Sequence, residues 1–334
     1  MSLFVLQHSI FLLVLVRLPQ HHNPDSKGSI SYSASYKGVF IIGIIGHNGK
    51  IVDTYVPIFL KSVGRACPDI SVYICVSPFT EISNFSQEDY HVNVHYYFWG
   101  PKTFKEYKNS VPQKTPIKWN DWRFFAFYEL IEKVIISNFD YLFISDMDIL
   151  IFKNPFSYLT MTNTTEMIHM VSDQFPLTKK YSFDFNYKFL ANWWNNRNIL
   201  SNLSFYEPKF PLGADEGEYR SMAANIGTWF GKPKLIYEGM KIFIEIMKKA
   251  PDFKDRVGQG AFNYLKISGQ LYEYVPKEKW IFHQNSEGTF ITNINLSNPN
   301  HINAFKTRRV IMVHHWNMLK QQQLAQILFD YFYD

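Results

Sequence analysis

Cysteine is scarce in this sequence, whose 334 residues include only Cys67 and Cys75. Two cysteines cannot form a disulfide-dense scaffold, and their spacing matches no zinc-binding pattern. Cys75 lies in the apolar run 71–76, which favours a buried structural thiol. Stability must therefore come from a hydrophobic core, and the 46% hydrophobic content is sufficient for one large domain.

Runs of like charge are also missing. The net charge is only +5, the pair Arg308 and Arg309 does not extend into a longer basic run, and no basic helix is evident. These features argue against a nucleic-acid-binding surface, but they are compatible with a small anionic ligand held by a few cations. No internal repeat or low-complexity tract indicates a solenoid or a disordered array.

No apolar run reaches the length of about 20 residues that a typical membrane span needs. Residues 3–16 are apolar except at 7–9, which suits the core of a signal peptide or a marginal signal anchor; a buried N-terminal strand is the alternative. We interpret 1–18 as the signal peptide or signal anchor and the polar 19–37 as a linker or stem. This predicts a protein of the Golgi or endoplasmic reticulum lumen, single-pass membrane or secreted. N-glycosylation sequons agree with it, at Asn84, Asn163, Asn202 and Asn295.

Residues 38–334 are expected to form one α/β domain. Continuous apolar runs rich in β-branched residues are typical of strands buried on both faces of a parallel sheet. The apolar pattern predicts strands at 38–46, 70–76, 91–98, 141–145, 169–172, 224–231 and 310–313. Helical periodicity predicts helices at 51–64, 119–136, 233–249, 259–267 and from Met318 onwards. This order predicts an open, mostly parallel sheet flanked by helices.

Two carboxylates, Asp146 and Asp148, directly follow the predicted strand 141–145. Open α/β sheets bind ligands beyond the carboxyl ends of their strands. Residues two apart in an extended chain project to the same side, so both carboxylates should face one cleft while Met147 points into the core. Like charges this close favour a cation between them, and oxygen ligands suit Mg²⁺ or Mn²⁺. The alternative is a solvated turn.

The segment 141–156, an apolar strand followed by Asp-x-Asp and an Asn-Pro turn, resembles a segment of GT-A fold glycosyltransferases, which use nucleotide-sugar donors. The segments 225–231, 258–265 and 310–317 resemble later motifs of the same family in the same order. The resemblance covers about residues 38 to 320. It implies a single GT-A-like catalytic domain in which Asp146 and Asp148 are catalytic and hold Mn²⁺ or Mg²⁺.

The resemblance also implies residues that contact the donor sugar. Asn225 and Gly227 would line it from one strand, while Gln259 and Asn263 would approach it from a helix start. One position departs from the family pattern, because Gly258 stands where relatives have an aspartate before Gln259. Candidate substitutes for that carboxylate are Asp173 and Asp255.

Histidine and lysine residues near the end of the chain complete the implied site. Either His314 or His315 would be the third metal ligand, and since neighbours in a strand face opposite ways, we expect only one of them to bind. Lys320 would reach a phosphate group. Asp215, in a charged loop, is a candidate acceptor-side acid, with simple solvation of the loop as the alternative.

Arg123 is unusual because it lies among aromatic residues on a helix that we expect to be buried. A buried guanidinium needs an anionic partner. The resemblance places a basic residue of this helix near the donor; the alternatives are a pair with Glu129 or exposure at the helix edge. The loop 46–50, which follows the first predicted strand, is expected to line the nucleotide base.

The combined prediction is metal-dependent transfer of a hexose or pentose from a nucleotide-diphosphate sugar to a glycan, protein or lipid hydroxyl. A non-catalytic sugar- or nucleotide-binding relative is one alternative. A haloacid-dehalogenase-type phosphohydrolase is another, because such enzymes also place Asp-x-Asp after an apolar strand and use the first Asp as nucleophile. That motif requires Thr or Val where this chain has Leu150.

Overall fold

The computed structural model describes residues 36–45, 49–77, 85, 87–110, 119–161, 168–176, 222–249, 258, 262, 280–283, 289–292, 299–307 and 309–314. The chain divides into two units, Met1–Ser35 and Tyr36–Asp334, and every described residue belongs to the second. No helix among the described residues has the length and apolar character that crossing a membrane requires. The predicted signal segment lies outside the described residues, so it stays a prediction.

A seven-stranded sheet forms the centre of the second unit, in the order β3-β2-β1-β4-β7-β6-β8. The strands are β1 (Gly38–Gly43), β2 (Ser71–Val76), β3 (Asn93–Phe98), β4 (Tyr141–Ser145), β6 (Ile168–Pro176), β7 (Met222–Gly231) and β8 (Trp280–His283). The pairs among β1 to β4 are parallel, and so is the pair β6–β8. Only β7 runs against its neighbours within this sheet.

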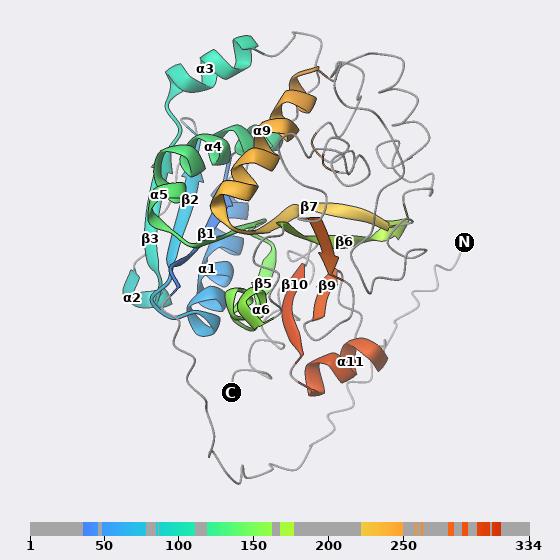
Figure 1. The fold of residues 1–334 in the computed structure, drawn as a ribbon. Helices are drawn as coiled ribbons and strands as arrows, with labels where there is room; N and C mark the ends of the chain where they lie inside the picture. The colour runs from blue at the N-terminus through green and yellow to red at the C-terminus, as the bar shows by residue number, and fades with distance from the viewer. Residues whose placement is uncertain are drawn as a thin grey trace, which may run out of the picture. The chain divides into compact units, whose positions relative to one another are not determined.

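A smaller sheet has the order β5-β10-β9 and consists of β5 (Ile149–Ile151), β9 (Thr289–Thr292) and β10 (Val310–His314). β5 pairs antiparallel with β10, and β9 pairs parallel with it. Because β5 follows β4 after only three residues, one short turn passes from the large sheet to the small one. Figure 1 shows the red and orange strands of the small sheet below the central sheet.

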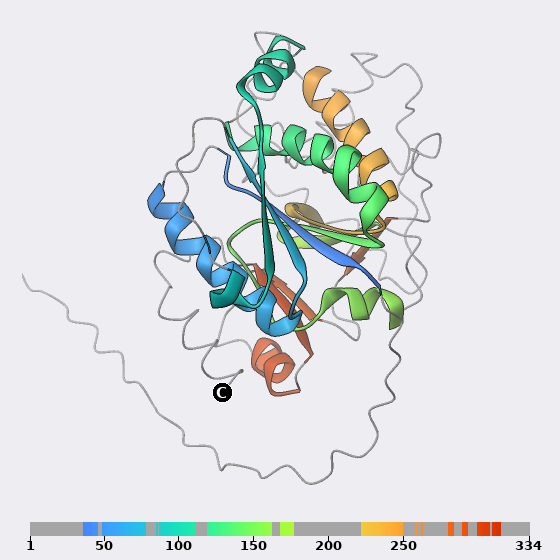
Figure 2. The same ribbon diagram turned by 90° about the vertical axis from the view of Figure 1, so that its left-hand side faces the viewer.

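Helices cover both faces of the large sheet, as Figures 1 and 2 show from two directions. One face packs against α4 (Arg123–Leu130) and α9 (Pro233–Lys249), and the other against α1 (Gly49–Ala66) and the small sheet. The remaining helices are α2 (Gln87–Tyr90), α3 (Pro101–Ser110), α5 (Ile136–Asn138), α6 (Pro155–Met161) and α11 (Pro299–Lys306). A 3₁₀ turn, η1 (Trp119–Trp122), precedes α4, and a π-helical turn, η2 (Ile131–Ile135), follows it.

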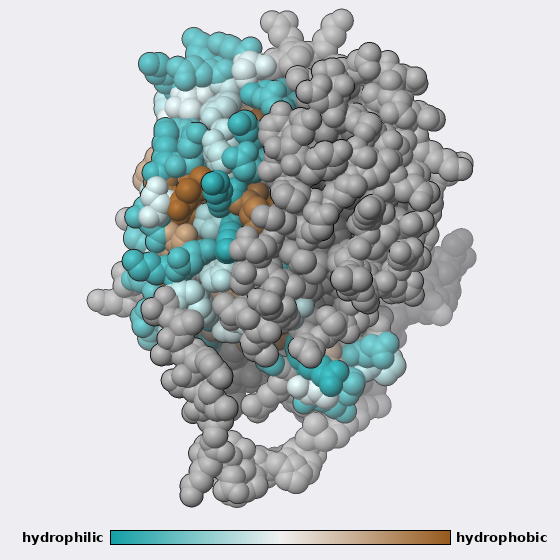
Figure 3. All heavy atoms as spheres, viewed as in Figure 1, coloured by the Kyte–Doolittle hydropathy of each residue, from teal (hydrophilic) through white to brown (hydrophobic). Residues whose placement is uncertain are grey.

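Strand β1 shows why the sequence forms this layered core. Val39 and Ile41 belong to the cluster under α4 and α9, whereas Phe40 and Ile42 belong to the cluster under α1. Side chains alternate between the faces of a strand, so a continuous apolar run is required where both faces are covered. The molecular surface differs from this core. On the face of the molecule that Figure 3 shows, the described residues are mainly hydrophilic, and the hydrophobic ones form small separate patches.

The predicted fold class is confirmed as an open, mostly parallel sheet flanked by helices in one α/β domain. The predicted helix 233–249 matches α9 from end to end. The predicted helix 119–136 is instead a series of four short helical pieces, because 3₁₀ and π turns interrupt the α geometry. The predicted helix from Met318 lies outside the described residues, and of the predicted helix 259–267 only Phe262 is described, in helical geometry.

Candidate functional site

Asp146 and Asp148 lie in the short turn that joins β4 to β5. The backbone N–H of Asp146 donates to the carbonyl oxygen of Gly227 on β7, at 2.8 Å. Met147 is buried in the core, as the alternation predicts, at 5% exposure. The carboxylates therefore lie at the carboxyl end of β4, where open α/β sheets bind their ligands. They occupy a turn between two sheets, which corrects the predicted extended segment.

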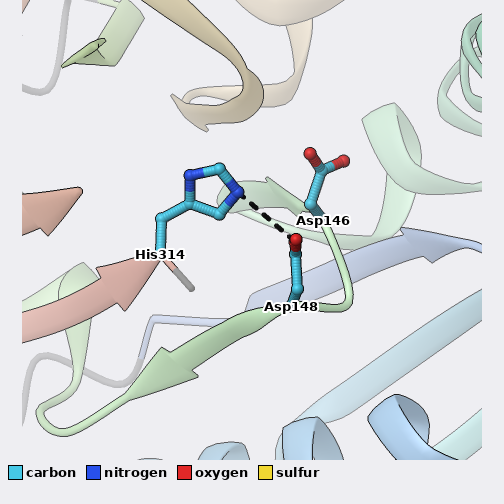
Figure 4. A group of neighbouring side chains, drawn as sticks. All are labelled: Asp146, Asp148 and His314. Carbon is cyan, nitrogen blue, oxygen red and sulfur yellow. Dashed lines mark ion pairs between the residues drawn. The ribbon is translucent and has the colours of Figure 1, made fainter. Parts of the chain in front are cut away.

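His314 joins this turn because of strand register. It is the last residue of β10 and pairs with Ile149, the residue after Asp148. Its Nε2 lies 3.4 Å from Asp148 Oδ1, and Figure 4 shows the imidazole reaching across to the two carboxylates. Its Nδ1 lies 3.2 Å from the side-chain Nδ2 of Asn225 on β7, so Nε2 is the nitrogen that faces the carboxylates. His315 lies outside the described residues.

The three side chains fit a divalent cation. One ligand atom from each of Asp146, Asp148 and His314 lies within 4.8 Å of the other two. Metal–ligand bonds of about 2.1 Å separate ligands on opposite sides of an ion by roughly 4.2 Å, so small side-chain movements bring these three atoms onto one ion. Two carboxylates with one imidazole form a donor set that can bind a divalent cation.

Arg123 reaches the same cluster from the first residue of α4. Its Nη2 lies 2.6 Å from Asp146 Oδ1, and its side chain is only 8% exposed. The guanidinium carbon also lies 4.9 Å from the centre of the Phe124 ring. A cation at a helix N-terminus opposes the helix dipole, so this position does not serve the stability of the helix. Of the three sequence-based interpretations of Arg123, the structure favours an anionic partner in the site over a pair with Glu129 or exposure at the helix edge.

A buried polar atom without a partner lies beside Asp146. Within the described part of the chain, the buried side-chain atoms that lack a hydrogen-bond partner are Arg123 Nε and Thr228 Oγ1. Arg123 contacts Asp146 directly, whereas the Thr228 side chain projects from the face of β7 opposite to Gly227. An unsatisfied buried polar group costs about 1–3 kcal/mol, and such groups are few in folded proteins. The position of Arg123 Nε is consistent with a site that a polar ligand completes.

The electrostatics of the cluster keep Asp148 ionised. Burial raises the pKa of Asp148, but the charge and hydrogen bond of His314 and the charge of Arg123 outweigh burial, so the net pKa is lowered. The opposite charges of Arg123 and, when protonated, His314 also reduce the repulsion between the two carboxylates. Asp148 is thus available as an anionic ligand at neutral pH.

Strand β7 supplies a third wall of the site. Asn225 Oδ1 accepts the backbone N–H of Gly227 at 2.7 Å, while its amide nitrogen faces His314. A Cβ atom on Gly227 would approach Asp146 Oδ2 to 2.2 Å, so only glycine leaves room for the carboxylate there. Asn225 therefore orients His314, and Gly227 admits Asp146, which explains the Asn-x-Gly pattern in physical terms.

The structure brings together six of the residues identified from the sequence: Arg123, Asp146, Asp148, Asn225, Gly227 and His314. The other candidates, Asp215, Gln259, Asn263, His315 and Lys320, lie outside the described residues, as do residues 46–48 of the expected base-binding loop. Of the two substitutes for the carboxylate absent at Gly258, Asp255 also lies outside them, and only the backbone of Asp173 is described, in β6.

One acidic residue near the site was missed by the sequence analysis. Asp121 lies in η1, two residues before Arg123, and is 8% exposed. Its Oδ2 lies 3.4 Å from the backbone nitrogen of Gly258. The signal was present, because a carboxylate between Trp119 and Trp122 is as unexpected in a buried aromatic segment as Arg123 is.

No family model matches the chain, and no curated protein matches it. Solved structures give similarities at low identity. An active-site mutant of LgtC aligns at 14% identity with a TM-score of 0.45, covering 86% of this chain and 95% of that one. The galactosyltransferase LgtC in complex with donor and acceptor sugar analogs aligns at 14% identity with a TM-score of 0.44, again covering 86% of this chain and 95% of that one. Mouse xyloside xylosyltransferase 1 aligns at 11% identity with a TM-score of 0.45, covering 84% of this chain and 98% of that one.

Proposed function

We propose that this chain is a metal-dependent glycosyltransferase, which transfers a hexose or pentose from a nucleotide-diphosphate sugar to a glycan, protein or lipid hydroxyl. The observation that carries the proposal is the convergence of Asp146, Asp148 and His314, with Arg123 beside them, at the carboxyl end of β4. The four ordered sequence motifs that resemble GT-A glycosyltransferases support it independently of this geometry.

The charges of the cluster suit a diphosphate only when a cation is present. Asp146 and Asp148 carry two negative charges against the one permanent positive charge of Arg123, so the cluster alone repels an anion. A bound Mn²⁺ or Mg²⁺ would reverse that balance and act as a Lewis acid on the diphosphate leaving group. Arg123 offers its Nε, which has no partner among the described residues, as a further donor to an anionic ligand.

Asn225 and Gly227 keep the ligands in place rather than react. Asn225 contacts the His314 nitrogen that faces away from Asp148, which fixes the orientation of the imidazole ring. Gly227 holds the backbone of Asp146 through its carbonyl oxygen. In this proposal the cluster binds and orients the donor diphosphate.

The test is release of nucleotide from a panel of donors: UDP-glucose, UDP-galactose, UDP-xylose, UDP-N-acetylglucosamine and GDP-mannose. We expect release with Mn²⁺ from at least one donor, stimulation by candidate acceptors, and loss of release with EDTA or in Asp148→Asn. Asp53→Asn, an exposed aspartate on α1, is the matched control and should retain wild-type activity. Donors that raise the melting temperature but are never cleaved would favour the non-catalytic relative instead.

We further propose that the domain resides in the secretory pathway. The support is sequence-based: the apolar residues 3–16, the polar stem 19–37 and the sequons. Expression in a eukaryotic secretory host should give a product whose gel mobility changes on glycosidase treatment. An unmodified cytosolic product would contradict this location and leave the enzymatic proposal intact.

A further inference from the structure

Asp121 is a buried carboxylate that the proposed catalytic set does not use. It lies in η1, the 3₁₀ turn immediately before α4, and its residue exposure is 8%. The segment that its side chain contacts indicates what this carboxylate can do.

The carboxylate lies flat against Gly258, which is far away in the sequence. A Cβ atom built on Gly258 would lie 2.8 Å from Oδ1, 2.9 Å from Cγ and 3.1 Å from Oδ2 of Asp121. The Gly258 nitrogen lies 3.4 Å from Oδ2. The side chain of Asp121 thus occupies the volume into which any side chain at 258 would project, so the two positions can hold only one carboxylate between them.

Asp121 belongs to the chain segment that supplies Arg123 to the site. Residues two apart on a helix do not face each other, so Asp121 and Arg123 diverge from the start of α4: Arg123 reaches Asp146, and Asp121 reaches Gly258. Four residues along the chain from Gly258, the ring centre of Phe262 lies 4.7 Å from that of Trp229. Trp229 belongs to β7, the strand that carries Asn225 and Gly227.

Carboxylates are well suited to recognise sugars. An ionised Asp only accepts hydrogen bonds, and its two oxygens offer about four acceptor positions. Sugar hydroxyls are donors, and hydrogen bonds to a charged acceptor are roughly twice as strong as neutral ones. The cation and Arg123 would hold the diphosphate in the proposed function, so a sugar attached to it extends from the cluster toward neighbouring walls. A fixed carboxylate there can choose among hydroxyl patterns.

We propose that Asp121 is a sugar-positioning residue, whose carboxylate accepts hydrogen bonds from hydroxyls of the donor sugar beside Gly258. The inference rests on the proposed function, because it needs a nucleotide-sugar donor. The inference goes beyond the proposed function by naming a specificity-determining residue in η1 that the sequence motifs do not include. The glycine at 258 is required because Asp121 already fills its side-chain volume.

The experiment compares two ligands on the full chain in the presence of Mn²⁺: the nucleoside diphosphate, UDP or GDP, and the nucleotide sugar that wild type prefers in the donor panel. The ratio of the two affinities measures the contribution of the sugar to binding. In Asp121→Asn we expect unchanged nucleoside diphosphate affinity, within twofold, and a loss of about 10- to 100-fold in the sugar-dependent ratio. The preference of wild type for that sugar over its deoxy analogues should disappear with it.

A relocation variant provides the sharpest control. Asp121→Gly combined with Gly258→Asp returns one carboxylate to the same volume from the opposite segment, and should recover part of the sugar-dependent ratio that Asp121→Gly loses. Asp53→Asn, exposed on α1, should leave both affinities unchanged. If Asp121→Asn does not fold, Gly258→Ala serves instead, since its methyl group displaces the carboxylate without removing its charge; the ratio should again fall.

The outcomes separate the two proposals. Wild-type protein that binds no nucleotide sugar and no nucleoside diphosphate with Mn²⁺ overturns the proposed function, and this inference with it. Wild-type protein that uses a nucleotide sugar, with Asp121→Asn retaining the ratio and the deoxy-sugar preference, overturns the inference alone. A variant in which both affinities fall in parallel with the melting temperature assigns Asp121 a structural role and also overturns it.

Discussion

Helix α4 carries a buried charged side chain near each end, and the two differ in how completely their hydrogen bonds are made. At its C-terminal end, Glu129 is 7% exposed; its Oε2 accepts from the indole N–H of Trp99 at 3.0 Å, and its Oε1 from Lys133 one turn later. At its N-terminal end, Arg123 pairs with Asp146, but its Nε has no partner among the described residues. Glu129 is thus satisfied locally, whereas Arg123 is satisfied only in part.

The surroundings reinforce the contrast. Around Glu129 the neighbours are tyrosines, and burial together with Glu129 raises the pKa of Tyr97 and of Tyr107, the latter to about 12, so both phenols stay neutral hydrogen-bond donors. Around Arg123 the neighbours are two carboxylates and an imidazole, which are metal-ligand types. A buried charge whose hydrogen bonds are all made indicates a structural role. A buried charge that keeps an unpaired hydrogen-bond donor beside metal-ligand side chains indicates a binding site.

Asp148→Asn should give the largest effect in this comparison. Losing one anionic ligand removes Lewis-acid stabilisation worth several kcal/mol, so we expect activity to fall by about 10³-fold. Nucleoside diphosphate and Mn²⁺ together should raise the wild-type melting temperature by more than the sum of their separate shifts. The variant should lose this excess; a variant that retains it would rule out the metal site.

Arg123→Ala should reduce kcat/KM by about 10- to 100-fold, the range for losing a hydrogen bond to a charged group. Asp146 loses its partner as well, but the Asp146 side chain is 21% exposed, so water can reach it and the fold should survive. Steady-state kinetics and circular dichroism check the two parts. Wild-type kinetics in a folded variant would show that Arg123 has a structural role, as Glu129 does, and would contradict the difference between the two ends of α4.

Glu129→Gln should behave in the opposite way. The neutral amide weakens the bonds from Trp99 and Lys133, so the free energy of unfolding should fall by about 1–3 kcal/mol in urea titrations. Activity per folded molecule should remain at the wild-type level. A selective loss of activity at unchanged stability would show that the C-terminal end of α4 also serves the site.

Lys133→Ala should have the smallest effect. The Lys133 side chain is 57% exposed, so water screens its charge, and the buried Glu129 keeps the indole N–H of Trp99; we expect a loss of no more than about 1 kcal/mol. Unfolding curves of this variant and wild type should nearly coincide, and the small difference should shrink further in high salt. A loss comparable with that of Glu129→Gln would mean that Lys133, rather than Trp99, satisfies the buried carboxylate.

The sequence predicted the parts of the fold whose signal is local and strong. Strands buried on both faces, such as β1 and β4, read as unbroken apolar runs, and α9 has a clear amphipathic period. It missed α3, where Phe104 is the only buried residue, and β5, which has three residues and exists only through pairing with β10. Short elements defined by tertiary pairing carry little periodicity of their own.

The same division holds for the site. Asp146, Asp148 and Asn225 were found because their motifs follow strands directly, and Arg123 because a cation is conspicuous among aromatic residues. Asp121 was missed because its partner, Gly258, is brought to it by the fold rather than by spacing. The position of His314 beside the carboxylates likewise depends on the register of β10 against β5, which no pattern within β10 reveals.

The turn between the two sheets also has a consequence for how the protein matures. Asp146 is attached to β4 and β7, whereas Asp148 leads into β5, and His314 reaches them only through the β5–β10 pairing. Two ligands are thus synthesised about half the chain's length before the third, and such distant contacts form late in folding. Tight Mn²⁺ binding should therefore appear only after β10 has docked, and a refolding experiment followed by metal affinity would time that last step.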